Sequence, residues 1–344
     1  MPEIKLGEIV QRLRQAERIL VTSHISPDGD AVGAVLAVYH IIRALHDREV
    51  VCSLAHPVPK RYAWLPGADR ICPPGVCAPP FDVAVIVDVA QLDRIGAVSA
   101  LVGDETQVIV LDHHLEDAPA GDLAVVDPRY AATGELIIEL MDIAGVSLTR
   151  EIAECAYVAL ATDTGSFKYS NTTERTHRIA ARLVATGLPV AEIGRRVFDE
   201  MSAARFRLLI RFVNSVALLD GGRIALGTVT AKDMAESEAL EEDTEGLINF
   251  ARNIEGVDVA MLFREVDNHT VKLSLRSREG VNSAGILRSL GGGGHAAAAG
   301  TTLEMPLRQA TALALRHVRE ALQQTVHSVS CRASRTWRNA RAVA

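Results

Sequence analysis

The sequence contains few aromatic residues and no long apolar run. Phe, Trp and Tyr together make up 4% of the 344 residues, so a core must be built mainly from Ala, Val, Leu and Ile. No stretch of about 18 uncharged apolar residues occurs, which excludes a membrane-spanning helix. The segment 1–19 is amphipathic and charged, without the apolar centre of a signal peptide. These absences predict a cytoplasmic protein without a membrane partner.

Cysteine is also scarce, and acidic residues outnumber basic ones. The five cysteines form no CxxC pair, and no histidine stands at zinc-finger spacing from Cys72 and Cys77, so we expect reduced thiols instead of a thiolate metal site. The formal net charge of −7 argues against duplex DNA as a partner, because a long DNA footprint needs a basic surface. A small anionic substrate is compatible with this charge, since bound divalent ions can supply positive charge locally.

The length of the chain favours two domains over one. In the first half, strand-like apolar runs alternate with helical patterns, which is typical of a mostly parallel sheet in an α/β fold. Strands are expected at 18–23, 49–54, 82–88, 106–111 and 123–126. Helices are expected at 31–45, 133–144, 150–161 and 174–186.

Breaks at Gly187, Pro189 and Gly221–Gly222 divide the rest of the chain. They predict a domain at 1–187, a helical linker at 188–222 and a smaller α+β domain at 223–325. In the smaller domain, strands are expected at 223–229, 257–265 and 270–276, and helices at 240–252, 282–290 and 306–323. The last two strands should form a hairpin with its turn at Asp267–His269. The Arg-rich tail, 326–344, has little apolar content and is expected to be disordered.

Ionisable side chains follow three of the expected strands. Asp112, His113 and His114 come directly after the apolar run 108–111, and Asp88 directly follows another such run. The other members of this set are His24, Asp28 and Asp30 after the first strand, and Asp163 in a later helical segment. Such side chains are costly to bury and bind metals well. Because functional groups of an open parallel sheet gather at the carboxyl ends of its strands, we expect them to converge on one metal centre.

This ligand set combines carboxylates with imidazoles and contains no sulfur. It suits Mn²⁺ or Mg²⁺, with Zn²⁺ or Fe²⁺ as alternatives, and its imidazole content favours Mn²⁺. The donors are too many for one ion, whereas two ions about 3.5–4 Å apart, bridged by a carboxylate, would use them all. A single aspartate after a strand is usually a helix cap or a turn residue, so the prediction depends on the motifs occurring together.

Five segments resemble the motifs of a known family. HISPDGDA at 24–31, VIVD at 85–88, LDHH at 111–114 and TDTGSF at 162–167 resemble, in this order, the four motifs of the DHH phosphoesterase family. GGGGHAAAAG at 291–300 resembles the glycine-rich signature of the associated DHHA1 domain. The likeness extends from about residue 15 to residue 323, and the size and layout are similar to the bacterial nanoRNase (oligoribonuclease) and pAp phosphatase subfamily.

The resemblance implies a role for each residue of the predicted metal centre. Its metal ligands would be His24 and Asp28 for one Mn²⁺, Asp30, His113 and Asp163 for the other, and Asp88 for both. Its catalytic residues would be His114, which contacts the scissile phosphate, and Asp112, which orients the histidines. In one departure from the family, Asp88 is followed by Val89 and Ala90 instead of a small hydroxyl residue, which removes a hydrogen-bond donor.

The resemblance also implies a substrate-binding segment in the second domain. Four consecutive glycines would let the backbone approach a ligand and present its N–H groups, although a flexible linker is the simpler explanation for glycines alone. Arginine forms bidentate contacts with phosphate. The expected substrate-binding residues are Arg276, Gly292, Gly293, Gly294 and His295.

The function implied is that of a two-metal phosphoesterase, with a catalytic DHH domain and a substrate-binding DHHA1 domain. Its expected substrates are short oligoribonucleotides (nanoRNA), cleaved to mononucleotides, and 3′-phosphoadenosine 5′-phosphate (pAp), converted to AMP. A phosphodiesterase for cyclic di-AMP or linear dinucleotides stays open as an alternative. The scarcity of lysine near GGGGH disfavours a pyrophosphatase or polyphosphatase, and the intact ligand set disfavours a non-catalytic nucleotide-binding module. The oligomeric state also stays open, with a homodimer as one option.

Overall fold

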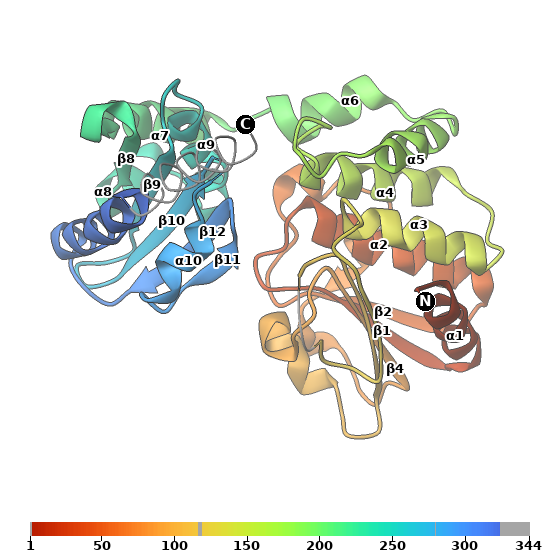
Figure 1. The fold of residues 1–344 in the computed structure, drawn as a ribbon. Coiled ribbons are helices and arrows are strands. Elements are labelled where there is room, and N and C mark those ends of the chain that lie inside the picture. Colours follow the sequence, from red (N-terminus) through yellow and green to blue (C-terminus); the bar gives the residue numbers. More distant parts are fainter. Residues whose placement is uncertain (1, 116–118, 279, 324–344) are drawn as a thin grey trace, which may run out of the picture. The chain divides into compact units, whose positions relative to one another are not determined.

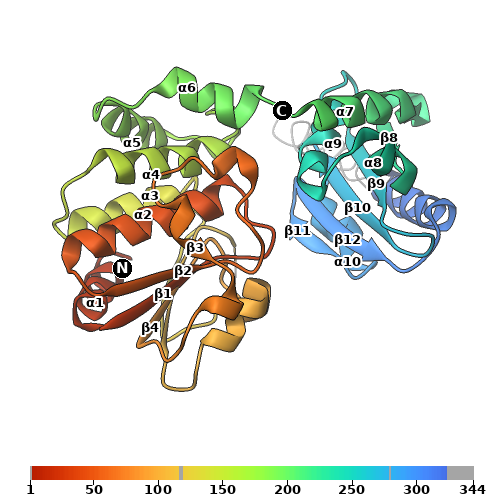
Figure 2. The same cartoon turned by 180° about the vertical axis from the view of Figure 1, so that it is seen from behind.

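Two six-stranded sheets organise the chain, one in each of two units (Figures 1 and 2). The structure, a computed structural model, describes residues 2–115, 119–278 and 280–323. The first unit ends at Glu200 and the second begins at Met201, within the predicted linker. The predicted α/β class, with a parallel-sheet domain followed by a smaller α+β domain, is confirmed. The predicted tail at 326–344 lies outside the described residues.

All neighbouring strands of the first sheet are parallel. Its strands are β1 (Arg18–Thr22), β2 (Glu49–Ser53), β3 (Ile71–Cys72), β4 (Val83–Val87), β5 (Gln107–Asp112) and β6 (Leu123–Val126). Their order is β3-β2-β1-β4-β5-β6, so the direction of winding reverses between β1 and β4. In sheets of this kind, ligands bind at the carboxyl ends of the strands where the order reverses. A ligand-binding site is therefore expected at the carboxyl ends of β1, β4 and β5.

Both faces of this sheet are covered, because its strands are apolar on both sides. Ile19 and Val21 of β1 belong to one buried cluster, whereas Leu20 between them belongs to another. The first cluster includes side chains of α1 (Pro2–Gln15), α2 (Gly29–Leu45), α3 (Thr133–Ile143) and α4 (Arg150–Asp163). The second includes side chains of the 3-10 segment η4 (Leu92–Leu101). The helices predicted near α2, α3 and α4 are confirmed, whereas α1 and η4 were not predicted.

Helices α2 and α4 pack so closely that glycine is required at two contacts. A Cβ atom on Gly33 would lie 2.5 Å from the carbonyl oxygen of Cys155 and 2.9 Å from the Cβ atom of Ala159. A Cβ atom on Gly29 would lie 2.4 Å from Cγ2 of Thr162. The start of α2 thus meets the end of α4, and the two helices run in opposite directions. The aspartates at the start of α2 consequently lie beside the last residue of α4.

The second unit has a mixed sheet between two sets of helices. Its order is β11-β12-β10-β9-β8-β7, in which only β8 and β9 pair in parallel. The strands are β7 (Ala217–Leu219), β8 (Ile224–Val229), β9 (Val259–Glu265), β10 (Val271–Ser277), β11 (Gly293–His295) and β12 (Ala298–Leu303). One buried cluster joins the sheet to α10 (Ser283–Arg288) and a helix at 307–323, and another joins it to α7 (Ala203–Ser215) and α9 (Leu247–Arg252). The predicted hairpin of β9 and β10 is confirmed.

The remaining helices are short, apart from α5. They are η1 (Lys60–Tyr62), η2 (Ala68–Arg70), η3 (Pro74–Val76), α5 (Glu174–Val184), α6 (Val190–Gly194), η5 (Arg195–Asp199), η6 (Asp220–Gly222), α8 (Ala231–Ser237) and η7 (Glu241–Thr244). Within the described ranges, no helix combines the length and the apolar character needed to cross a membrane.

One predicted helix of the second unit is wrong. The pattern at 240–252 predicted a single helix, but the structure has the 3-10 turn η7 followed by the separate helix α9. Gly246 between them has a φ of 73°, which a continuing right-handed helix cannot accommodate. Helix α8 was not predicted, although Thr230 and Asp233 form a capping box at its start.

Candidate metal centre

Three adjacent strands of the first sheet end in ionisable side chains. His24 follows β1 after one intervening residue, Asp88 directly follows β4, and Asp112 ends β5 with His113 next in the chain. Because β1, β4 and β5 are parallel neighbours, these residues meet at one edge of the sheet although they are distant in sequence. Asp88 has a φ of 60°, and such a conformation is rare for residues other than glycine and clusters at functional sites.

Two helix ends add three more carboxylates. Asp28 is the N-cap of α2, where its Oδ1 accepts a hydrogen bond of 3.1 Å from the backbone N–H of Ala31. Asp30 lies in the first turn of α2 and is buried, and Asp163 is the last residue of α4. The close packing of α2 on α4 brings these carboxylates together. Asp28 is therefore a helix cap, as a lone aspartate usually is, but it also lies beside His24.

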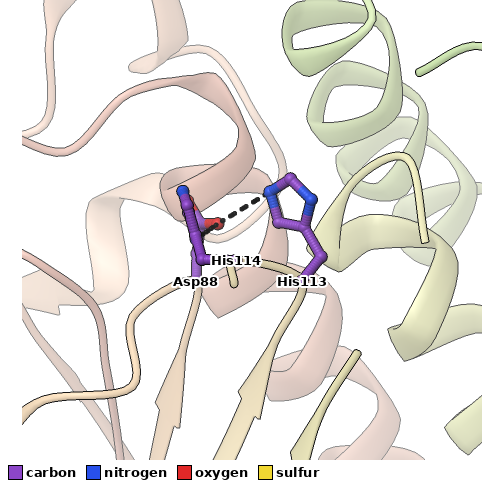
Figure 3. A group of neighbouring side chains, drawn as sticks. All are labelled: Asp88, His113 and His114. Carbon is purple, nitrogen blue, oxygen red and sulfur yellow. Dashed lines mark ion pairs between the residues drawn. The ribbon is translucent and has the colours of Figure 1, made fainter. Parts of the chain in front are cut away.

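The carboxylate of Asp88 lies between two imidazoles. Its Oδ2 is 3.4 Å from Nε2 of His24. Its Oδ1 is 3.6 Å from Nε2 of His113, and Figure 3 shows Asp88 beside this histidine. Nε2 of His113 also lies 3.3 Å from Oδ2 of Asp163 and 3.7 Å from Oδ2 of Asp30. Nε2 of His24 lies 3.9 Å from Oδ1 of Asp28. Each oxygen of Asp88 thus faces a separate group of ligand atoms.

These groups have the composition and spacing of metal ligands. His24, Asp28 and Asp88 form one set, Asp30, His113 and Asp163 another, and Asp88, His113 and His114 a third, with the ligand atoms of each set within 4.8 Å of one another. Atoms bound to one ion lie about 3 Å apart, because each is about 2.1 Å from the metal. Nε2 of His113 is buried and has no hydrogen-bond partner among the described residues. A cation would give this nitrogen and the surrounding carboxylates a common partner, so the donor set fits a divalent metal.

Burial and crowding change the protonation of this cluster. Burial raises the pKa of Asp163 to about 7, and the negative charges of Asp88 and Asp28 contribute to the same shift. Burial also raises the pKa of Asp30 well above its usual value, together with the charges of Asp88 and Asp163. Burial of His24 acts to lower its pKa, but the contact with Asp88 and the nearby carboxylates outweighs this and raises it to about 9. The metal-free cluster therefore holds protons that a bound cation would displace.

Asp112 and His114 form a pair next to these ligands. Oδ1 of Asp112 accepts hydrogen bonds from the backbone N–H groups of His113, at 2.7 Å, and His114, at 3.2 Å. It also lies 2.7 Å from Nδ1 of His114, and since an ionised carboxylate only accepts, Nδ1 carries the proton. Asp112 thus fixes both the backbone of the histidine pair and the tautomer of the second ring. This arrangement is compatible with the orienting role expected for it.

Two residues that contact the cluster were not predicted. Thr133, the first residue of α3, donates from its hydroxyl to Oδ1 of Asp88 at 3.0 Å, so Asp88 has a hydroxyl donor although none follows it directly in the sequence. Asn171 donates from Nδ2 to the carbonyl oxygens of Ala131, at 2.9 Å, and Asp163, at 3.2 Å. The only local sequence signal for Thr133 is a threonine at the start of an expected helix, which ordinarily indicates a cap.

The glycines predicted to bind substrate lie at the edge of the second sheet, in and before β11. A Cβ atom on Gly292 would lie 2.6 Å from the carbonyl oxygen of Gly300, and one on Gly294 would lie 2.5 Å from that of Ala298. Close strand packing therefore requires glycine at these two positions without any ligand. Gly293 differs, because a Cβ atom there would have nothing within 4 Å among the described residues.

Arg276 and His295 share one row of the second sheet. Arg276 of β10 pairs with Ala298 of β12, and Ala298 pairs in turn with His295 of β11. Nη1 of Arg276 donates to the carbonyl oxygen of Leu275 at 3.0 Å. The side chain of His295 lies outside the described part of the structure. The register therefore brings the two predicted contacts to one row of the sheet, two strands apart.

Two protein-family models match the chain. The model described as the DHH family, N-terminal domain, matches residues 18–160. The model described as the DHHA1 domain matches residues 227–327. The two matches follow each other in the order of the two units.

Several known proteins are similar to this chain over nearly its whole length. The bifunctional oligoribonuclease and PAP phosphatase NrnA of Thermus thermophilus is 37% identical over 320 residues, which cover 92% of this chain and 94% of that protein. The protein of the same name from Bacillus subtilis is 25% identical and covers 86% of this chain and 92% of its own length. A solved structure, an exopolyphosphatase-related protein from Bacteroides fragilis, has a TM-score of 0.85 at 26% identity, with 93% of this chain and 96% of that chain covered.

Proposed function

The chain belongs to the DHH family, and from this membership we propose that it is a phosphoesterase that cleaves short oligoribonucleotides to mononucleotides and converts pAp to AMP. The family predicted from the five motifs is confirmed. Relatives named oligoribonuclease and PAP phosphatase match along almost their entire length, which supports these two substrates. The observation that carries the proposal is the position of Asp88, whose two oxygens face two separate groups of ligand atoms.

The donor atoms suit two divalent cations that share one carboxylate. In this proposal His24 and Asp28 would hold one cation, and Asp88 would be a ligand of both. The ligands of the other cation would be Asp30, His113 and Asp163. Carboxylates and imidazoles without sulfur favour Mn²⁺, with Mg²⁺ as the alternative. When bound, such cations supply positive charge to the phosphoryl oxygens and lower the pKa of the attacking water.

The residues next to the ligands would act on the phosphate and on its charge. His114 would contact a phosphoryl oxygen through Nε2, because its Nδ1 is bonded to Asp112. Asp112 would hold the proton on Nδ1 and keep the ring in one orientation. Burial acts to lower the pKa of His114, but the hydrogen bond with Asp112 and the nearby carboxylates outweigh this and raise it to about 9, so the doubly protonated ring can also donate through Nε2. A donor fixed in this way stabilises the charge that develops on phosphate oxygens at a small cost in reorganisation.

The second unit would bind the remainder of the nucleotide. Arg276, Gly292, Gly293, Gly294 and His295 are the proposed contacts, and the shared row of Arg276 and His295 supports this assignment. The domain boundaries, a cytoplasmic location, a homodimer and the exclusion of duplex DNA remain predictions from the sequence.

A substrate panel tests the proposal directly. The purified chain, stripped of metal and then supplied with Mn²⁺, would be mixed separately with pAp, the dinucleotide pApA, cyclic di-AMP, pyrophosphate and a 24-nucleotide RNA. We expect AMP from both pAp and pApA at rates well above those for the other three substrates. Preference for cyclic di-AMP or pyrophosphate would contradict the proposed substrates, and the absence of any hydrolysis would contradict the enzymatic function.

A further inference from the structure

The start of α3 contacts the metal centre at two of its carboxylates. The hydroxyl of Thr133 donates to Oδ1 of Asp88 at 3.0 Å. The backbone N–H of Thr133 donates to Oδ2 of Asp30 at 2.7 Å, and that of Gly134 donates to Oδ1 of Asp30 at 3.1 Å. One turn of helix therefore holds the carboxylate proposed to bridge the two cations and a carboxylate that would bind only one of them.

This turn is buried and packs closely against α4. The side chain of Thr133 is completely buried, with 0% exposure. A Cβ atom on Gly134 would lie 2.8 Å from the Cβ atom of Ala159, so the start of α3 is pressed against α4. A polar side chain in such a place is costly unless it is hydrogen-bonded, and the hydroxyl of Thr133 uses Asp88 as its acceptor.

Asn171 connects the same turn to a third ligand. Its Nδ2 donates both to the carbonyl oxygen of Ala131, just before α3, and to that of Asp163, at the end of α4. The segment 131–134 is thus linked to Asp88, Asp30 and Asp163, which come from three distant parts of the chain. These contacts fix the relative positions of ligands assigned to different cations.

We propose that Thr133 is a positioning residue that orients the Asp88 carboxylate toward both cations and thereby sets the metal affinity of the centre. The inference rests on the proposed function, because it assumes that Asp88 binds metal. The hydrogen bond from Thr133 is directed at the oxygen of Asp88 that faces His113, so it limits rotation of the carboxylate. Neither Val89 nor Ala90, the residues after Asp88, has a side-chain donor that could replace it.

Three substitutions at this position separate the hydroxyl from the bulk of the side chain. Thr133→Val keeps the shape and removes the hydroxyl, Thr133→Ser keeps the hydroxyl, and Thr133→Ala removes both. Thr106→Val is a matched control, because Thr106 is also buried and donates from its hydroxyl to the carbonyl oxygen of Phe81, in a contact apart from the metal ligands. The affinity of each folded full-length variant for Mn²⁺ would be measured from the electron paramagnetic resonance signal of the free ion.

We expect Thr133→Val and Thr133→Ala to weaken Mn²⁺ binding about 10- to 100-fold, as is typical for the loss of a partner that orients a ligand. Thr133→Ser should bind within about threefold of the wild type, and Thr106→Val should lower only the melting temperature. If Thr133→Val does not fold, the comparison of Ser with Ala at the same position still isolates the hydroxyl. Equal Mn²⁺ affinity for Ser and Ala, or for Val and the wild type, would overturn the inference.

This experiment can fail independently of the proposed function. If the wild type binds Mn²⁺ and the hydroxyl controls the affinity, but neither RNA nor pAp is hydrolysed, the positioning role stands and the function is wrong. If hydrolysis occurs and the affinity does not depend on the hydroxyl, the function stands and the positioning role is wrong.

Discussion

In the first unit the candidate residues come from strand ends and helix ends that are distant in the sequence, whereas in the second they come from one strand and one short glycine-rich segment. In the first unit, burial and repulsion between neighbouring carboxylates raise the pKa of Asp30 and Asp163, and Nε2 of His113 is buried without a hydrogen-bond partner among the described residues. Gly292 and Gly294, in contrast, are needed by strand packing alone. A cluster that costs stability indicates function more strongly than one that the fold itself requires.

The largest effect is expected at Asp88. Asp88→Ala should lower the hydrolysis of pAp and pApA about 1,000-fold or more, because it removes the carboxylate proposed to bind both cations. The circular dichroism spectrum should remain that of the wild type. Asp142→Asn is the control, because Asp142 forms an exposed ion pair with Arg182 and should leave the rate unchanged. Full activity in Asp88→Ala would contradict the claim that the cluster in the first unit is a functional metal centre.

Alanine substitutions at Gly293 and Gly294 should distinguish a role in strand packing from a role in substrate binding. Gly294→Ala should destabilise the chain by about 2–3 kcal/mol, because its Cβ atom would collide with the backbone of Ala298 and its φ of 133° is unfavourable for alanine. Gly293→Ala should leave the melting temperature nearly unchanged, since its Cβ atom enters open space among the described residues. If the backbone there approaches a phosphate, Gly293→Ala should still raise KM for pAp. An unchanged KM would leave the glycine run with a packing role only.

Arg276 gives a smaller and more selective effect. Arg276→Ala should raise KM for pAp and pApA about tenfold, because a hydrogen bond to a charged group contributes about 1.5 kcal/mol. KM for a generic aryl phosphodiester should change much less, since that substrate lacks the nucleotide that Arg276 would contact. Arg278→Ala, which removes a neighbouring exposed charge, serves as the control. An equal rise in KM for both kinds of substrate would show that Arg276 does not contact the nucleotide.

The smallest effect concerns the stability of the metal-free protein. The pKa of Asp163 is raised to about 7, so between its ordinary value of 3.8 and 7 the folded state binds more protons than the unfolded chain. The contribution of this group to stability therefore falls as pH rises through that window. Asp163→Asn carries no charge and should raise the melting temperature at pH 8, in the presence of a chelator, by about 2–4 °C.

The advantage of Asp163→Asn should diminish at pH 5 and reverse when Mn²⁺ is added. The reversal follows because a bound cation would stabilise the wild type more than the variant. A variant that melts below the wild type in chelator at pH 8 would mean that Asp163 has a structural role.

The ligand residues could be predicted because each stands next to a strongly apolar strand or in a recognisable motif. The parallel order of the sheet then accounts for their convergence, as with Asp88 and His113. Thr133 and Asn171 could not be predicted, because their hydrogen bonds join segments that carry no local sign of the contact. The single helix predicted at 240–252 was wrong because the acidic segment 241–245 and the apolar segment 247–251 are separated by Gly246, whose left-handed backbone conformation interrupts a helix.

The most direct test of the central claim is a count of the Mn²⁺ ions that the full-length chain binds at saturation. One oxygen of Asp88 faces His24 and the other faces His113, and this arrangement predicts two ions per wild-type chain and a large loss of affinity for both in Asp88→Ala. Binding of no ion or a single ion to the wild type, or of two ions with unchanged affinity to Asp88→Ala, would contradict a centre built around that carboxylate.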